Sequence, residues 1–514
     1  MQSKHLVVLA ILAIYLLINL GIGFYINRKT ATDSNFMSSY FVGSRGMGGL
    51  VLAMTLVATY TSASSFLGGP GLASQYGLSQ SWIAGVQIGA TFLTLGVLGK
   101  KFALISRRIN AVTVSDYLRA RYHSSAVVIV CGLALVVFFI TQMIGQFMGG
   151  ATLIQTVTGL PYWAGLLLFG AVVVLYTAFG GFRAVVLTDT LQGFIMSCGT
   201  FLMLFFIIHQ CGGMSEIVNQ LNAGNPGWDL MGKGQYGADI TVLQPGYMLS
   251  YWVLVGIAVI GLPQTAVRCM GFKDTRSMHR AMIYGTIVIG ILMIGMHLAG
   301  TLSYPLVKDA NLSSTDQVIP YVVMKYMPSW AAGLFLAAPL AAVMSTVDSL
   351  LILSSATILK DIYLNYIVKR RVQKTNQEVD ALEDISDELP QTDLKKLPRI
   401  SFAITAVIGV VTCLIALNPP DVIAWINLFA FGGLEATFFW PIVGGLYWKK
   451  GNSKACLAST LTGLAVFVFF NRVKILPFNI HEIVAALIVG GIVYFVVGTL
   501  TSEELDPETL EKCF

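Results

Sequence analysis

Long apolar stretches, separated by short polar ones, run along almost the whole chain. A helix needs about 20 mostly apolar residues to cross a bilayer, and thirteen stretches come close to that length. They cover residues 6–26, 48–74, 81–99, 126–154, 162–182, 185–209, 248–270, 281–302, 330–358, 400–417, 422–448, 455–470 and 483–500, and only a turn around Arg183 separates the fifth from the sixth. The pattern predicts an all-α integral membrane protein with about thirteen transmembrane helices.

The composition agrees with a membrane protein. Of the 514 residues, 55% are hydrophobic and 11% are charged, and the mean hydropathy is +0.74. Soluble domains carry about 25% charged residues, so this chain has too little polar surface to face water on all sides. The net charge of +6 is scattered between apolar stretches, which argues against a nucleic acid partner. The seven cysteines form no CxxC pair, which argues against a disulfide framework or a zinc site.

Basic residues fall unequally on the two sides of the predicted bundle. With the N-terminus outside, the external side holds only six of the 32 lysines and arginines, and 26 remain for the other side. The six are Lys4, Lys233, Lys308, Lys325, Arg472 and Lys474. Because cytoplasmic loops are enriched in Lys and Arg, we predict an external N-terminus and a cytoplasmic C-terminus.

Two connections between the predicted spans are long and polar. Residues 212–246 form a Gly- and Asn-rich external stretch, and residues 369–399 form a cytoplasmic segment of mixed charge. Mixed charge suits a solvated helix or a flexible linker. We therefore expect no direct role in transport for the cytoplasmic segment.

The second predicted span is unusual because it is rich in hydroxyl groups. Seven hydroxyl residues lie between Thr55 and Ser65, and the run Gly68-Gly-Pro-Gly71 follows them. Serine and threonine in a membrane helix often bond back to the helix and serve packing. The whole cluster, followed by helix-breaking residues, instead favours an interrupted span. An interrupted helix frees backbone carbonyls near the midplane, where they can coordinate a cation.

The ninth predicted span supplies a partner for such an ion site. Ser345 and Thr346 offer hydroxyl oxygens, and Ala342 lies three residues before Ser345 on the same helical face. Sodium is a hard cation that prefers oxygen ligands, as calcium and magnesium do. Neutral carbonyl and hydroxyl groups can hold it without the tight grip of several carboxylates. That property suits a site that must also release its ion.

Other polar residues interrupt the predicted spans, namely Gln87, Gln142, Gln146, His297 and Glu435. Gln142 and Gln146 are four residues apart and share a helix face. His297 is typical of a core histidine with a satisfied ring. A buried Glu435 needs a partner or a proton, and it either faces the transport pathway or packs elsewhere. No lysine or arginine sits clearly at the midplane.

The residues argue against the main rival classes. An enzyme would show a catalytic motif such as HExxH or GxSxG, and the chain contains neither. A channel would show a symmetric filter or a pore-lining ring of residues. The tail after Leu500 has no room for a signalling domain. We predict a carrier, not an enzyme, without an organic cofactor.

Several motifs resemble the sodium/solute symporter family, from the first helix to about Lys450. Tyr176-Thr-Ala-Phe-Gly-Gly-Phe-Arg-Ala184, followed by Thr188-Asp-Thr190, is similar to the family's hallmark segment. The stretch Ala342–Thr346 is similar to its sodium-site helix. Within the family, strings such as Gly261-Leu-Pro-Gln-Thr-Ala-Val-Arg-Cys269 look like the branch that carries pantothenate.

The resemblance implies a LeuT-like fold, with a core of two inverted five-helix repeats in one transmembrane domain over residues 1–514. The expected parts are a first helix and loop (1–47), repeat one (48–210), an external loop (211–246), repeat two (247–448, with a cytoplasmic loop at 363–399), and two further helices with a short tail (449–514). It also implies a protein of the bacterial cytoplasmic membrane, surrounded by lipid and working as a monomer.

The resemblance further implies a sodium site between the second and ninth spans. Carried over by motif, its ligands are backbone carbonyls of Ala58, Thr61 and Ala342 and hydroxyls of Ser345 and Thr346. The solute is expected beside it, with Thr59, Tyr60, Gln142 and Glu435 as candidate contacts. Asp189 and Asp348, with Ser345, are candidates for a second sodium site or a gate. Asp189 follows the predicted turn, so a helix-cap role is an equal alternative.

The implied transport reaction is sodium-coupled uptake of pantothenate by alternating access. Proline carriers of the family have an aspartate where Tyr60 stands, a tyrosine where Gln142 stands, and aromatic residues where Val255 and Val259 stand. These departures weaken the proline interpretation. A monocarboxylate, proline or another amino acid remains the alternative solute.

Overall fold

The computed structural model describes residues 3–30, 45–224, 244–368, 397–473, 475–501 and 505–514, and this part of the chain is predominantly helical. Ten described helices are long and apolar enough to cross a membrane, and two bent pairs raise the number to twelve. The fifth predicted span corresponds only to a shorter apolar helix, Tyr162–Leu175. An all-helical, multi-pass membrane protein is therefore confirmed, whereas the count of thirteen stays a prediction. Loop residues 225–243 and 369–396 lie outside the described part.

The first half of the described chain begins with a long outer helix and continues through a broken one. Its elements are α1 (Ser3–Thr30), α3 (Gly49–Tyr60), η2 (Ser64–Gly68), α4 (Gly69–Tyr76), α5 (Leu78–Gln87), α6 (Ala90–Thr94), η3 (Leu95–Gly99), α7 (Lys100–Arg108), α8 (Val114–Tyr122), α9 (Ser125–Thr158), α10 (Tyr162–Gln210) and α11 (Met214–Gly224).

The second half begins with another broken helix and ends with a pair of long helices. Its elements are α12 (Pro245–Tyr251), η5 (Trp252–Ile257), η6 (Ala258–Gly261), α13 (Pro263–Met270), α14 (Thr275–Leu302), α15 (Tyr304–Val307), η7 (Thr315–Gln317), α16 (Val318–Tyr326), α17 (Ser329–Ala356), η8 (Thr357–Val368), α20 (Leu397–Ala416), α21 (Ile423–Phe439), η10 (Trp440–Gly444), α22 (Gly445–Tyr447), α23 (Ser453–Val473), η11 (Pro477–Asn479), α24 (Glu482–Leu500) and α25 (Pro507–Cys513).

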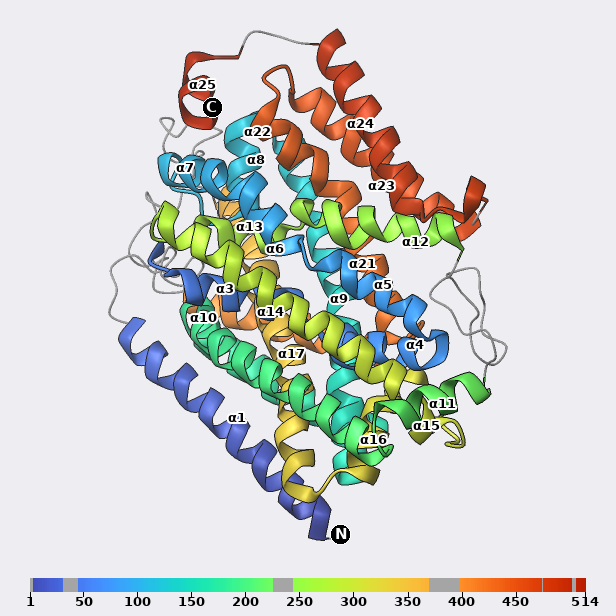
Figure 1. Ribbon diagram of the computed structural model, residues 1–514. Coiled ribbons are helices and arrows are strands. Elements are labelled where there is room, and N and C mark those ends of the chain that lie inside the picture. Colours follow the sequence, from blue (N-terminus) through green and yellow to red (C-terminus); the bar gives the residue numbers. More distant parts are fainter. Residues whose placement is uncertain (1–2, 31–44, 225–243, 369–396, 474, 502–504) are drawn as a thin grey trace.

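The helices form a bundle with α17 at its centre. The membrane-spanning part of α17 is completely buried, whereas most of α1 is not. Figure 1 shows α1 along one edge of the bundle, α23 and α24 at the opposite edge, and the two chain ends at opposite ends of the molecule. Polar residues in this buried part of α17 are therefore removed from lipid.

The second predicted span is broken, as its hydroxyl content indicated. Helix α3 ends at Tyr60, Thr61 takes an extended conformation, and the chain resumes as η2 and α4 at a bend of 69°. The run of glycines does not make the break, because it lies inside η2 and α4. It allows close packing instead: a Cβ on Gly71 would collide with the carbonyl oxygen of Thr315 in η7.

A second broken span is fixed by a proline. The segment from α12 to η6 ends at Gly261, and α13 begins at Pro263 with a bend of 48° between them. Leu262 is extended, with φ −73° and ψ 121°. A residue before proline is sterically driven out of the helical region, and proline suits the first helical position. This break therefore follows from local sequence.

The element α10 contains two arms that run in opposite directions. The ring of Phe206 lies 6.1 Å from that of Trp330 at the start of α17. If α10 were straight and antiparallel to α17, Asp348 would lie beside about residue 188, since both helices rise equally per residue. The Thr177 hydroxyl donates to the Asp348 carboxylate instead. The chain therefore turns back between the arms, in agreement with the predicted turn around residue 183.

Candidate ion and solute site

The five residues predicted to bind sodium come together where α3 ends beside α17. The Ser345 hydroxyl donates to the carbonyl oxygen of Ala58 at 2.8 Å, and the Thr346 hydroxyl donates to that of Thr61 at 2.9 Å. Both hydroxyls also lie within 3.1 Å of the Ala342 carbonyl oxygen on their own helix. We call these five residues the sodium cluster.

The chemistry of the sodium cluster suits a monovalent cation. All five residues are fully buried, and their polar groups are neutral carbonyls and hydroxyls. A hydroxyl has one proton and two lone pairs, so each can turn its proton to the Ala342 carbonyl. Its lone pairs then face the Ala58 and Thr61 carbonyls, which the helix break has released. This rotation would leave lone pairs of the hydroxyl and carbonyl oxygens free to accept a cation.

Thr59 and Tyr60, which precede the break, face different surroundings. The Thr59 hydroxyl donates to the Thr55 carbonyl oxygen at 2.8 Å and lies 3.5 Å from the Ser349 hydroxyl. The Tyr60 hydroxyl donates to the Val255 carbonyl oxygen at 2.9 Å, and its ring lies 6.2 Å from that of Phe431. Of these two predicted solute contacts, only Tyr60 lines the pocket described next.

A pocket with about 470 Å³ of empty volume lies beside the break. Its lining comes from both broken helices and from α5, α14 and α21: Tyr60, Ser64, Ser65, Gly69, Leu72, Gln80, Ile83, Gln87, Val255, Met293, His297, Ala424, Asn427, Leu428 and Phe431. None of these described lining residues carries a formal charge at neutral pH. The pocket therefore offers neutral hydrogen-bonding groups set among apolar side chains, as solute sites usually do.

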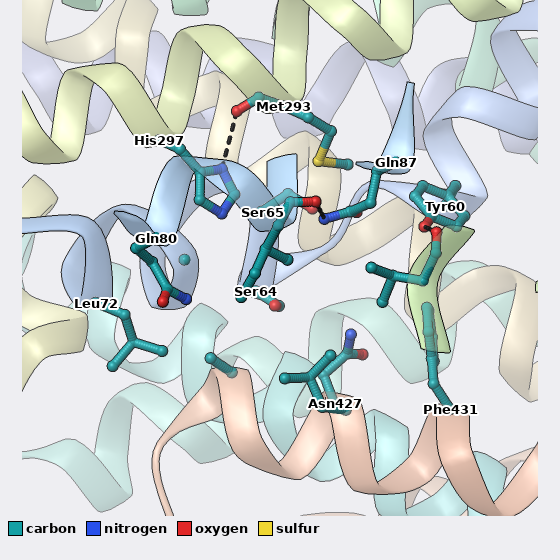
Figure 2. Close-up of a pocket in the computed structure, with 15 residues that line it drawn as sticks. Tyr60, Ser64, Ser65, Leu72, Gln80, Gln87, Met293, His297, Asn427 and Phe431 are labelled. Carbon is teal, nitrogen blue, oxygen red and sulfur yellow. Dashed lines mark hydrogen bonds between the residues drawn. The ribbon is translucent and has the colours of Figure 1, made fainter. Parts of the chain in front are cut away.

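The amides and the histidine of the pocket retain hydrogen-bonding capacity. Figure 2 shows Asn427 reaching from α21 into the space below Ser64 and Gln87. The side-chain oxygens of Asn427 and Gln80 are buried and have no hydrogen-bond partner among the described residues. His297 bonds the Met293 carbonyl oxygen through Nδ1 at 2.8 Å, as expected for a satisfied ring. It nevertheless lines the pocket with the rest of that ring.

Gln142 and Glu435, the other two predicted solute contacts, lie outside this lining. Both are fully buried, and their side-chain polar atoms have no hydrogen-bond partner among the described residues. They come from α9 and α21, which pack along one another. The side-chain oxygen of Gln146, one turn along α9 from Gln142, accepts the Ala63 amide at 2.8 Å just beyond the break. Buried polar groups without partners are costly, and the role of these two residues as solute contacts stays a prediction.

Residues Thr55, Asp189, Arg268 and Ser349 form a second buried polar group, which we call the charge layer. Arg268 pairs with the Asp189 carboxylate at 3.2 Å and donates to the Ser349 hydroxyl at 2.7 Å. The Thr55 hydroxyl donates to the same carboxylate at 2.6 Å, and Arg268 Nε lies 3.1 Å from that hydroxyl. All four residues are fully buried. The layer lies one helical turn from the sodium cluster on both α3 and α17.

The charge layer resolves one sequence-based alternative and adds a residue that sequence reasoning did not place. Arg268 is fully buried where α13 meets α3, α10 and α17. Asp189 lies inside α10 and bonds side chains of α3 and α13, so the helix-cap alternative is wrong. The Asp348 carboxylate lies next to Ser349 in α17 and accepts the Thr177 hydroxyl of the other α10 arm.

The short element η7 contacts the start of α21. Asp316 of η7 accepts the backbone amide of Ile423, the first residue of α21, at 3.2 Å. Burial raises the pKa of Asp316 to about 6. The contact fixes the start of the helix that carries Asn427.

Sequence reasoning missed Gln80, Asn427 and Arg268 as members of these sites. Arg268 stands inside the motif 261–269, but its apolar surroundings gave no information on its depth. Asn427 follows the start of its helix closely, and Gln80 precedes the predicted third span. The only sequence pattern that they share is a polar side chain at the edge of an apolar run.

In comparisons with known proteins, this chain is similar to membrane transporters. Residues 40–463 match the model of the sodium:solute symporter family. A sodium/pantothenate symporter of Escherichia coli is 47% identical over 94% of this chain and 95% of its own length. One from Haemophilus influenzae is 44% identical over 98% of both chains. An osmoregulated proline transporter of Bacillus subtilis is 29% identical over 95% of this chain and 94% of its own.

Solved structures show the same fold in distant transporters. A sodium-coupled sialic acid symporter, in a substrate-bound outward-open state, matches with a TM-score of 0.72 at 19% identity, over 97% of this chain and 99% of that one. A nucleobase-cation-symport-1 family transporter, in a closed conformation with bromovinylhydantoin bound, matches with a TM-score of 0.55 at 14% identity, over 92% of this chain and 97% of that one. At these identities, the likeness concerns the fold alone.

Proposed function

The chain belongs to the sodium:solute symporter family, and we propose that it couples sodium influx to the uptake of pantothenate by alternating access. Two near full-length relatives at 44–47% identity are sodium/pantothenate symporters. The relative that transports proline is only 29% identical. The substrate assignment is drawn from this difference and from the pocket, because family membership alone leaves the solute open.

The observation that carries the proposal is the sodium cluster. Two hydroxyls of α17 bridge to two carbonyls that the break in α3 has released, and the Ala342 carbonyl completes the set. In the proposed mechanism, sodium replaces the cross-helix hydrogen bonds and holds α3 against α17 through shared oxygen ligands. Since the cluster has no carboxylate, its grip on the ion is moderate, and release on the other side is feasible.

The polar groups that line the pocket are complementary to those of pantothenate. This anion carries a carboxylate, an amide and two hydroxyls. Gln80 and Asn427 offer buried amide oxygens without partners, and Ser64 and Ser65 add hydroxyls. We propose these residues, with Tyr60, as the solute site. Thr59, Gln142 and Glu435 stay candidates for contacts made in another state of the cycle.

The negative charge of the solute explains why sodium is needed. Moving one negative charge inward against an inside-negative potential costs about 2.3 kcal/mol per 100 mV. One sodium cancels that charge, so the sodium concentration gradient alone drives uptake. A second sodium would make transport electrogenic and more strongly concentrative. Because Arg268 is engaged by Asp189, the solute carboxylate must rely on hydroxyls, amides or the bound sodium.

We further propose the arrangement implied by the family. It has thirteen spans, two inverted five-helix repeats within a single domain, an external N-terminus and a cytoplasmic C-terminus in the bacterial inner membrane, and a monomeric working unit. The two bent pairs support the repeats, because each is the first span of its proposed repeat. In this orientation, the charge layer faces the cytoplasm.

The decisive experiment is uptake of labelled pantothenate by proteoliposomes that contain the purified protein. With an inward sodium gradient, we expect accumulation that disappears when choline replaces sodium. A membrane potential imposed without sodium should not restore it. Equal uptake with and without sodium would refute the coupling. Sodium-driven uptake of acetate or proline, with none of pantothenate, would move the assignment to a monocarboxylate or an amino acid.

A further inference from the structure

The charge layer joins the two broken helices to α10 and α17. Arg268 comes from α13 and Thr55 from α3, and each of these helices is one half of a bent pair. Asp189 and Ser349 come from α10 and α17, which pack along one another. The ion pair and its hydrogen bonds therefore cross the boundary between the broken helices and the neighbouring α10 and α17.

The charge layer closes one side of the sodium cluster. Thr55 lies one turn before Ala58 in α3, and Ser349 lies one turn after Ser345 in α17. Arg268, at the level of these two residues, is 0% exposed and contacts both. A sodium ion that leaves towards the start of α3 must therefore pass the guanidinium group. In the proposed orientation, this direction leads to the cytoplasm.

Hydrogen bonds connect the charge layer to the sodium cluster. Arg268 donates to the Ser349 hydroxyl at 2.7 Å, and that hydroxyl donates to the Ser345 carbonyl oxygen at 2.8 Å. The Ser345 hydroxyl in turn donates to the Ala58 carbonyl oxygen. When sodium binds, Ser345 must turn its hydroxyl proton away from Ala58. Ser345 would thus contact the ion through its hydroxyl, and through its carbonyl oxygen it contacts Ser349, which accepts a hydrogen bond from the guanidinium of Arg268.

The energetics of a buried ion pair favour a conformational role over a stabilising one. Removing two charges from water costs much of what their attraction returns, so apolar replacements are often neutral or stabilising. Separation of the pair becomes feasible once water enters and solvates both groups. Moreover, Asp189 Oδ1 is buried without a hydrogen-bond partner among the described residues. The carboxylate therefore keeps one oxygen available to a passing cation.

We propose that Arg268 is a positioning residue that gates the release of sodium. Bound to Asp189 and Ser349, its guanidinium closes the exit while sodium occupies the sodium cluster. When α13 moves away from α10, water enters, the pair separates, and the Asp189 carboxylate guides sodium outward. This gate rests on the proposed function for its sodium, but it does not depend on which solute is carried.

Cys269 provides a reporter for this gate, because it is adjacent to Arg268 and 0% exposed. The experiment uses the full-length protein in proteoliposomes, with Cys269 kept as its only cysteine. The rate of Cys269 modification by a membrane-impermeant maleimide is measured with sodium and with choline, from the side on which α13 ends. We expect sodium alone to slow the modification in this parent protein, because it holds the gate closed.

The Arg268→Gln substitution should open the gate. Loss of the charged hydrogen bonds should raise the modification rate about tenfold and remove the protection by sodium. Arg268→Lys keeps the charge but loses the forked geometry, so it should keep part of the protection. Unchanged, sodium-protected modification in Arg268→Gln would overturn the proposal.

Two further variants separate gating from general damage. Arg121 is also buried, but it donates to the carbonyl oxygens of Gly445 and Trp448, away from the charge layer. Arg121→Gln should leave the protection by sodium intact, and a loss equal to that of Arg268→Gln would count against a specific gate. If Arg268→Gln fails to fold, the milder Ser349→Ala should weaken the protection, and full protection there would overturn the proposal.

The same measurement separates this proposal from the proposed function. A parent protein whose Cys269 responds to sodium, but which does not transport pantothenate, would overturn only the solute assignment. A parent protein that transports pantothenate with sodium, yet shows no effect of sodium on Cys269, would overturn only the gate.

Discussion

The sodium cluster and the charge layer lie one turn apart on the same two helices, yet their chemistry is opposite. Ala58 and Ser345 belong to the first, and Thr55 and Ser349 belong to the second. The sodium cluster is built from neutral dipoles, whereas the charge layer contains a guanidinium and a carboxylate at 3.2 Å. A cation bound in the sodium cluster could leave, whereas the positive charge of the charge layer is the Arg268 side chain, which is covalently attached to the protein.

This difference shows how a transporter can place a mobile charge beside a fixed one. Arg268 neutralises Asp189 while the pair is closed, so in that state the carboxylate would not trap a transported ion. The sodium cluster has no such counterion, and its affinity depends on how many oxygens converge. Substitutions in the two regions should therefore affect different quantities: stability and gating in the layer, and ion affinity in the cluster.

The largest effect is expected from Asp189→Asn, which leaves the buried charge of Arg268 without a counterion. Breaking one side of a buried ion pair costs about 3–5 kcal/mol, whereas Ser345→Ala removes neutral hydrogen bonds worth about 1 kcal/mol each. The apparent melting temperature of the purified protein should fall much further in Asp189→Asn. The double variant with Arg268→Gln should recover part of the loss, and a smaller fall in Asp189→Asn than in Ser345→Ala would contradict the comparison.

The next effect concerns sodium affinity and should belong to the sodium cluster alone. Removing both hydroxyls, by Ser345→Ala with Thr346→Ala, should raise the sodium concentration for half-maximal uptake about 10- to 100-fold, the range for losing bonds to a charged group. Sodium titration of pantothenate uptake measures this shift. Ser354→Ala is the matched control, because it is a buried serine on the same helix. Unchanged sodium dependence in the double variant would exclude this ion site.

A smaller effect should separate the solute pocket from both regions. Asn427→Ala should raise the KM for pantothenate about tenfold, since an unpaired polar group on the solute costs about 1–3 kcal/mol. The half-saturating sodium concentration at saturating solute should not change. Asn19, a buried asparagine that bonds the Tyr15 carbonyl oxygen within α1, gives the control Asn19→Ala. A shift in sodium affinity without a shift in KM would remove Asn427 from the solute site.

The smallest effect is a dependence of stability on pH that arises outside both regions. The folded pKa of Asp316 is about 6, above its usual 3.8, so the folded protein binds the proton more tightly than the unfolded chain. The stability gained from this proton is complete below about pH 4 and is lost as pH rises through about 6. Asp316→Asn should flatten this part of the melting temperature profile, and an unchanged profile would contradict the assignment.

Much of the fold could be predicted from the order of apolar and polar residues. Twelve of the spans predicted from hydropathy match a described long helix or bent pair. The prediction works because a segment that crosses lipid must bond its backbone groups internally, as a helix does. The break at Leu262 follows from Pro263, and the hydroxyls before Ser65 indicated a break that occurs at Thr61. The resemblance of their motifs also predicted that the residues of the sodium cluster meet, and they do.

Only the tertiary structure decided which distant residues meet. Arg268 and Asp189 are 79 residues apart, and Thr55 is 134 residues from Asp189. Nothing in the local pattern of either helix sets such a contact, since it depends on how α13 packs against α3, α10 and α17. Asn427 likewise lines the pocket only because α21 packs beside the break in the first bent pair. The sequence determined the spans and the breaks because lipid exclusion and proline sterics act locally. The charge layer and the pocket arise only when several helices converge.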